Sequence, residues 1–114
     1  MITSILLGHL VGDYLLQTRW MFAHKSPFNG ALLAHVFVYS LALFAFLAGF
    51  LALSGQSYDG ILFYVAINAF LHLVVDGISS KVTKVYLKRF DYGSFFVALG
   101  IDQTAHAIIL INTL

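Results

Sequence analysis

Seven ionisable side chains stand inside stretches of sequence that are otherwise apolar. Six of them form three pairs in which a histidine and an aspartate are four residues apart: His9 with Asp13, His72 with Asp76, and Asp102 with His106. The seventh, His35, has no such partner in its own stretch. A spacing of four places both side chains on one face of a helix, about one turn apart. Imidazole and carboxylate groups ligate Zn, Mn, Fe and Ni, so these residues predict a metal site.

The order of residues within each pair predicts that the pairs share a direction in space. In helices that alternate in direction, the first and third run one way and the fourth runs the other. Histidine precedes aspartate in the first and third helices, and aspartate precedes histidine in the fourth. The aspartates therefore form one layer, and the paired histidines form another about 6 Å deeper at a rise of 1.5 Å per residue. We expect the seven side chains to converge on one site.

One or two divalent cations (Zn, Mn, Fe or Ni) are the cofactor that this site predicts, and two ions about 3.5 to 4 Å apart would share carboxylates. The expected ligands are His9, Asp13, His35, His72, Asp76, Asp102 and His106. The expected catalytic residues are Asp13, Asp76 and Asp102, of which an uncoordinated one would act as general base. Three carboxylates with no Lys or Arg at the same depth in the membrane also need cations or protons before a membrane tolerates them.

Simpler explanations of these polar residues stay open. A single buried histidine is more often a hydrogen-bonded core residue than a ligand, and one His/Asp pair can merely stabilise its helix. For the whole set, a proton relay or a structural hydrogen-bond network is the alternative to metal. Gln17, one turn beyond Asp13, and Asn68, one turn before His72, either orient ligands and substrate or join helices through hydrogen bonds.

Membrane helices are the elements that must position these side chains. The chain has 114 residues, of which 61% are hydrophobic and 10% charged, and its mean hydropathy is +0.91. Soluble domains carry about 25% charged residues. Apolar stretches that approach or exceed the about 20 residues needed to cross a bilayer cover residues 2–21, 30–53, 60–86 and 94–114. We predict an all-α integral membrane protein, a four-helix antiparallel transmembrane bundle that forms a single membrane domain over residues 1–114.

Basic residues predict how this bundle is oriented. They flank the first and third connections between helices: Arg19, Lys25, Lys81, Lys84, Lys88 and Arg89. The second connection carries only Asp59. Because Lys and Arg beside membrane segments are retained in the cytoplasm, we predict a multi-pass protein of the cell (inner) membrane with both termini outside. Lys81, Lys84 and Lys88 chiefly set this topology, and contact with a lipid headgroup is a second role for them.

The composition also excludes several functions. The net charge is only +1, and the basic residues form no face with interleaved exposed aromatics, so we expect no nucleic-acid partner. The absence of cysteine excludes disulfides, thiolate metal sites, iron–sulfur clusters and cysteine nucleophiles. The partners that remain are the lipid bilayer and a lipid-phosphate substrate.

The His/Asp motifs resemble a small family of bacterial and phage membrane proteins known as domain of unknown function 3307. The resemblance rests on HLVGDYLLQT at residues 9–18 with Trp20 and Met21 after it, His35, HLVVD at 72–76 and DQTAH at 102–106. It implies a four-helix membrane fold in which the His/Asp set is important, and it implies no reaction. A looser similarity, in the His-plus-Asp helices alone, is to small membrane-bound metal-dependent hydrolases, whose additional His-Ser motif this sequence lacks.

Three functions follow from an intramembrane His/Asp metal site. The first is hydrolysis of a phospholipid or isoprenoid phosphate by a metal-activated water. The alternative is a divalent-metal or proton transporter or channel, which the apolar outer parts of the helices and the lack of an inverted repeat disfavour. A homo-oligomer would be needed to give such a transporter an exit path. Haem binding is a third, in which carboxylates beside most of the histidines would crowd the porphyrin.

Overall fold

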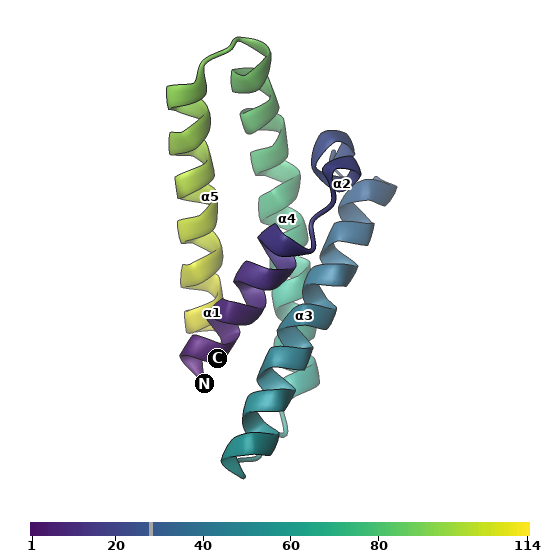
Figure 1. Cartoon of the computed structure of the whole chain (residues 1–114), viewed down its shortest axis with the longest axis vertical. Helices are drawn as coiled ribbons and strands as arrows, with labels where there is room; N and C mark the ends of the chain where they lie inside the picture. The colour runs from purple at the N-terminus through teal and green to yellow at the C-terminus, as the bar shows by residue number, and fades with distance from the viewer. Residues whose placement is uncertain (28) are drawn as a thin grey trace.

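The computed structural model describes residues 1–27 and 29–114, and within them the chain is built from helices and short connections (Figure 1). The elements are α1 (Ile2–Leu10), the π-helical turn η1 (Val11–Leu15), α2 (Arg19–His24), α3 (Gly30–Ser54), α4 (Ile61–Lys88) and α5 (Tyr92–Asn112). Helices α3, α4 and α5 are long and apolar enough to cross a membrane, and α1 with η1 forms a shorter apolar helix. The predicted all-α membrane bundle is confirmed.

The first apolar stretch differs from the helix predicted over residues 2–21. After α1 the turn widens, and the amide of Leu16 donates to the carbonyl of Val11 at 2.9 Å, a π-helical spacing. Thr18 then caps α2 by accepting the amide of Met21 at 3.2 Å. Hydropathy could not indicate this break because the sequence stays largely apolar across it. Single π turns are frequent at functional sites, and Asp13 lies in this one.

The remaining helices begin and end within a few residues of the predicted positions, with recognisable caps. Asn29 Oδ1 accepts the amide of Leu32 at 2.9 Å where α3 begins, and Asp91 Oδ1 accepts that of Ser94 at 3.1 Å where α5 begins. Gly55 ends α3 with a φ of 65°, a left-handed conformation that glycine adopts without strain.

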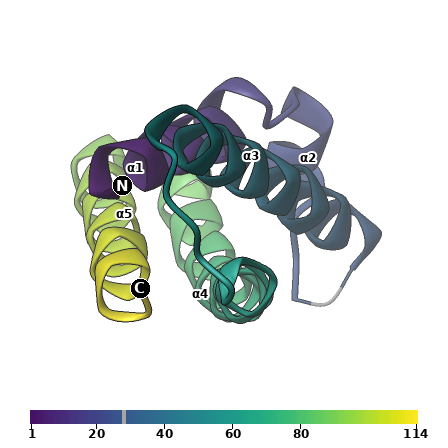
Figure 2. The ribbon, with the colours of Figure 1, turned by 90° about the horizontal axis from the view of Figure 1, so that it is seen from below.

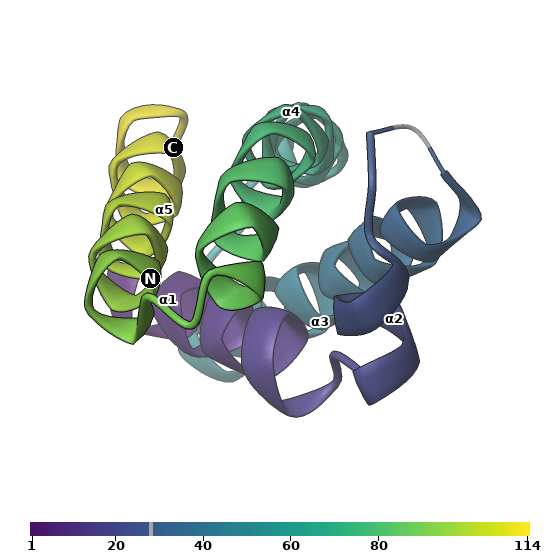
Figure 3. The same cartoon turned by 90° about the horizontal axis from the view of Figure 1, so that it is seen from above.

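Helices α1, α3, α4 and α5 form a ring in which each contacts the next, and α1 closes the ring against α5. Figure 2 shows this order, with α4 on the side opposite α1. The chain termini lie together toward one end of the bundle, and α2 lies near the other end with the α4–α5 connection (Figures 1 and 3). We call these the termini end and the α2 end. The ring encloses the positions from which polar residues can face one another.

Two glycines allow α1 and η1 to lie directly against α3. A Cβ atom added at Gly8 or at Gly12 would come within 3.0 Å of an α3 atom, closer than real Cβ atoms normally approach. Small residues spaced by four are a common device for close helix contacts in membranes. Each glycine directly precedes a predicted ligand, so the close approach brings His9 and Asp13 up to α3.

An apolar core fills the interior toward the termini end. It consists of Ile5, Tyr39, Leu43, Leu47, Leu51, Tyr64 and Leu110. The Tyr64 hydroxyl donates to the Leu110 carbonyl at 2.9 Å and so connects α4 with α5. Toward the α2 end, carboxylates and imidazoles are buried beside apolar residues such as Leu32 and Val36.

Candidate metal centre

The seven predicted ligands are gathered in one buried group, which we call the His/Asp cluster. Its members are His9, Asp13, His35, His72, Asp76, Asp102 and His106, each less than one-tenth exposed. They come from α1, η1, α3, α4 and α5, so every helix of the ring contributes. The spacing and order of these residues in the sequence therefore correctly predicted that their side chains lie on the inner faces of the helices.

Four members of the cluster are spaced like the ligands of one metal ion. His35 Nε2 lies 3.0 Å from Asp13 Oδ1 and 3.2 Å from Asp76 Oδ2. His72 Nε2 lies 3.4 and 3.5 Å from the same two oxygens, and 3.1 Å from His35 Nε2. Ligands about 2.0–2.1 Å from a tetrahedral zinc ion would be about 3.3 Å apart. These atoms could hold an ion after only small displacements.

A second group of potential ligand atoms adjoins the first. Asp13, Asp102 and His106 each offer one atom, and these atoms lie within 4.8 Å of one another. His106 Nε2 is 3.6 Å from Asp102 Oδ1 and 3.1 Å from Asp76 Oδ1. Asp76 therefore directs Oδ2 to the first group and Oδ1 to His106. A carboxylate shared in this way can bridge two ions, as in the di-metal sites of helical bundles.

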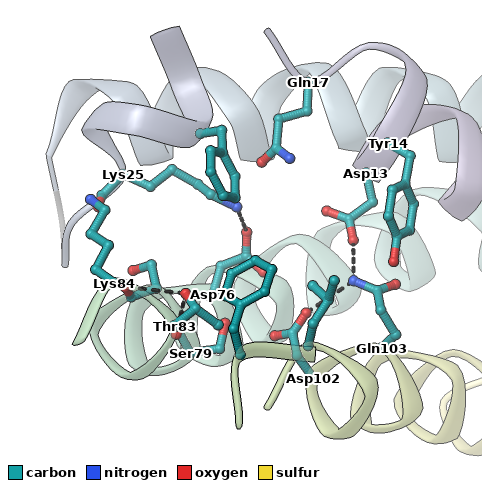
Figure 4. A pocket seen from close by; sticks show the side chains of 14 residues that line it. Asp13, Tyr14, Gln17, Lys25, Asp76, Ser79, Thr83, Lys84, Asp102 and Gln103 are labelled. Carbon is teal, nitrogen blue, oxygen red and sulfur yellow. Dashed lines mark hydrogen bonds and ion pairs between the residues drawn. The ribbon is translucent and has the colours of Figure 1, made fainter. Parts of the chain in front are cut away.

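Gln103 joins the edge of the cluster, although the sequence analysis did not single it out. Its Nε2 donates to Asp13 Oδ2 at 2.7 Å and to Asp102 Oδ2 at 2.9 Å (Figure 4). Its Oε1 lies 2.9 Å from Nε2 of His9, which is 3.9 Å from Asp13 Oδ2. His9 is in neither group of potential ligands, so the structure places it beside them. An amide next to Asp102 in an apolar helix was the available signal.

Ring stacking fixes the central imidazole. The His72 ring lies between that of Tyr39, at 3.9 Å and 12°, and that of His106, at 4.2 Å and 28°. Among the described residues, Nδ1 of His9, His35 and His72 has no hydrogen-bond partner. Metal-bound histidines usually donate from their second nitrogen, whereas here packing orients the ring of His72.

Lys25 pairs with the cluster from the connection between α2 and α3. It is 9% exposed, and its Nζ lies 2.8 Å from Asp76 Oδ2 (Figure 4). The sequence predicted no basic partner for the buried carboxylates and treated Lys25 only as a topology charge, so this expectation is corrected. A connection has no periodicity from which its contacts can be predicted. An ion bound by Asp76 would share that oxygen with Lys25 or displace it.

A polar cavity leads from the cluster toward the α2 end. It has a volume of about 50 Å³, which is room for a few water-sized groups. The carboxylates of Asp13, Asp76 and Asp102 line it, and so do Lys25 and Lys84 (Figure 4). Lys84 Nζ donates to the Lys25 carbonyl, which ties α4 to the connection above the cavity. The cavity therefore has carboxylates and two ammonium groups along one short path.

The remaining predicted site residues are divided by the structure. Gln17 lines the cavity, and its buried Oε1 has no hydrogen-bond partner among the described residues. Asn68 instead donates to the Tyr64 carbonyl at 2.8 Å and to Thr113 Oγ1 at 2.9 Å. Asn68 thus joins α4 to the end of α5, because one turn before His72 lies nearer the termini end.

The three lysines expected near a headgroup also differ from one another. Lys84 lines the cavity, whereas Lys81 and Lys88 are exposed on the outside of α4. All three lie in the last turns of α4, and α4 ends at the connection to α5, at the α2 end (Figure 1). Only Lys84 is therefore in a position to reach a group inside the cavity.

Comparison with known proteins gives one match. No curated protein and no solved structure matches the chain. The model of a family described as "Protein of unknown function (DUF3307)" matches residues 1–114, which is the whole chain. All members of the His/Asp cluster lie within the match. The chain belongs to the DUF3307 family.

Proposed function

We propose that this chain is an intramembrane metal-dependent hydrolase of a lipid phosphate. The observation that carries the proposal is that Asp13 belongs to both ligand groups and that Asp76 directs Oδ2 to the first group and Oδ1 to His106. Two ions that share carboxylates are typical of sites that hydrolyse phosphate esters. The metal could be Zn, Mn, Fe or Ni, since imidazole and carboxylate suit them all.

Asp102 is the residue best placed to act as general base, with Asp13, His106 and Asp76 Oδ1 holding the second ion in its place. Its Oδ2 is held by Gln103 at 2.9 Å, while its buried Oδ1 has no hydrogen-bond partner among the described residues. Divalent ions in the cluster would activate a water and neutralise charge on the phosphoryl oxygens. Asp102 would accept a proton from this water as the water oxygen bonds to phosphorus. The ester P–O bond would break, and the leaving oxygen would take up the proton from Asp102 to become an alcohol, which restores the Asp102 carboxylate.

Lys84 and Lys25 would bind the phosphate group of the substrate. Both line the cavity that leads to the carboxylates, and ammonium groups attract the anionic headgroups of lipids. The exposed Lys81 and Lys88 add positive charge outside the cavity at the same end of α4. A phosphate from the adjoining leaflet would meet these charges before it reached the cluster.

We also propose that the α2 end faces the cytoplasm and that both termini lie outside the inner membrane. The basic residues gather at the α2 end, whereas Asp59 is the one charged residue of the α3–α4 connection. Since the chain has no cysteine, the variants Ser26→Cys and Ser57→Cys report on one site each. An impermeant maleimide applied from outside should label position 57 and leave position 26 unreacted. The reverse pattern would show that the orientation is wrong.

Elemental analysis and a phosphate-release assay test the hydrolase proposal. Purified protein should contain one or two divalent ions. When it is reconstituted in phosphatidylcholine vesicles, it should release phosphate from phosphatidic acid or an isoprenoid monophosphate, and EDTA should stop the reaction. Asp102→Asn should lower the rate about 10²- to 10⁴-fold, the usual contribution of a general base. Asp59→Asn, in an exposed connection, is the matched control. Movement of ions or protons without phosphate release would favour a transporter, against which the apolar core at the termini end argues.

A further inference from the structure

A second hollow lies between α4 and α5, and most of its wall is apolar. Its volume is about 280 Å³, and its only polar residues are Ser79 and Asp102. The small side chains of Ala98 and Ala105 leave space that larger residues would fill. The exposed Ile101 lies along it, 66% accessible, so the hollow opens toward lipid in a membrane. We call it the α4–α5 groove.

The groove continues along the two helices toward the α2 end. A neighbouring hollow shares Val82, Ala98 and Ile101 with it and reaches Gly93, where Asp91 and Ser94 make its lining polar. From Ala105 to Gly93 the two together follow about 18 Å of α5, at 1.5 Å per residue. One leaflet contributes about 15 Å to the hydrocarbon core of a bilayer. The end of the groove at Gly93 therefore lies near the membrane surface, and the part that can hold a hydrocarbon chain is the apolar part around Ala98 and Ala105.

The groove and the polar cavity meet at two side chains. Ser79 and Asp102 line both hollows, the groove on the lipid side and the polar cavity inside the ring. Asp102 is buried, at 7% exposure, and its unpartnered Oδ1 is the oxygen assigned above to the general base. A ligand with a polar end at Asp102 would have an apolar surface for its other end directly beside it.

We infer that the α4–α5 groove binds the single hydrocarbon chain of a phosphate monoester whose phosphate lies in the polar cavity. The inference rests on the proposed hydrolase function and names its substrate class, an amphiphile with one saturated or isoprenoid chain. The phosphate faces Lys25 and Lys84, and the chain leaves the cavity between Ser79 and Asp102. The apolar wall and the two ammonium groups match the two ends of such a molecule.

Filling the groove should remove the preference for a long chain. Ala98→Phe and Ala105→Phe place a large ring in it, and Ile108→Phe, at a lipid-facing position that is 56% exposed and outside the groove, is the matched control. We expect kcat/KM for dodecyl phosphate to fall about tenfold or more through misplacement of the reacting group. Hydrolysis of p-nitrophenyl phosphate, which has no chain, should stay unchanged. An equal loss with both esters, or no loss with either, would overturn the inference.

A labelling experiment decides the same point without any turnover. Dodecyl phosphate with a diazirine in its chain is added to wild-type protein in phosphatidylcholine nanodiscs, and adducts are mapped by mass spectrometry. Adducts should concentrate on Val82 and Ile101, disappear with excess dodecyl phosphate, and be lost in Ala98→Phe. Uniform labelling that includes Ile108 would show that bulk lipid fills the groove. Absence of labelling at Ile101, together with crosslinks between two copies of the chain there, would show that a second copy covers it. Either result overturns the inference, whereas absence of hydrolysis with groove-specific labelling would reject the hydrolase alone.

Discussion

Toward the termini end the interior of the bundle is filled by aliphatic and aromatic side chains, whereas toward the α2 end it holds carboxylates, imidazoles and a cavity. Leu43 and Leu47 are fully buried against their neighbours in the first region. In the second, Asp13 and Asp76 are also buried, at 5% and 2% exposure, and Lys25 is paired with Asp76. The same helices therefore carry a packed apolar half and a charged half.

The contrast separates the half of the bundle whose packing stabilises the fold from the half that could bind metal. Buried carboxylates are costly in a membrane, and a single lysine cannot neutralise three of them. The apolar half must therefore hold the helices together, because without cations the buried carboxylates of the polar half are not neutralised. Substitutions in the two halves should separate these roles.

Asp13→Asn should produce the largest change. Asp13 contributes to both groups of potential ligands, so its loss should weaken metal binding at least about 100-fold, more than loss of an outer hydrogen-bonding partner, which costs about 10- to 100-fold. The metal-free protein should stay folded or become more stable, because one buried charge is removed. Metal titration followed by thermal unfolding measures both. Unchanged metal affinity would contradict a site at this cluster.

Leu47→Ala should affect the apolar half alone. Leu47 is fully buried in the core, and its truncation should lower the free energy of unfolding by about 2–5 kcal/mol through lost packing. The metal content of the folded protein should not change, since no cluster residue is touched. Denaturant unfolding in detergent, with elemental analysis of the folded fraction, tests this. Loss of metal from folded Leu47→Ala protein would mean that the halves are coupled.

Gly12→Ala should act on both halves through the contact between η1 and α3. The new Cβ would lie 3.0 Å from Tyr39 Cα, so the helices must separate at a cost of about 1–3 kcal/mol. Asp13 would move with η1, and metal affinity should fall as well. Gly49→Ala is the control, because nothing lies within 4 Å of its Cβ position; a helical glycine replaced there should raise stability by about 0.5–1 kcal/mol. Equal effects at both glycines would contradict the close approach.

Tyr64→Phe should cause the smallest change. It removes the hydroxyl that donates to the Leu110 carbonyl at 2.9 Å, and one neutral hydrogen bond is worth about 1 kcal/mol. The shape of the core is kept, so metal affinity should equal that of the wild type. Parallel unfolding and metal titrations would show this, and a metal affinity that fell with stability would count against independent halves.

Patterns in the sequence were sufficient to predict the membrane helices and the residues that meet inside them. Apolar length predicted the three long spans, and the four-residue spacing placed each His/Asp pair on one helix face. Alternating helix direction then brought these faces to a common depth. These inferences succeeded because periodicity is a property of one helix, and antiparallel order follows from short connections.

The details that give the site its chemistry could be seen only in the tertiary structure. The Lys25–Asp76 pair and the bridging amide of Gln103 arise from contacts between elements far apart in the chain. The same is true of Asn68, which lies on the predicted face but bonds to the end of α5. The π turn at Asp13 is local, but hydropathy carries no signal for it. Which carboxylate oxygen faces which imidazole depends on the distances between helices, and these are set by packing that no pattern within a single helix records.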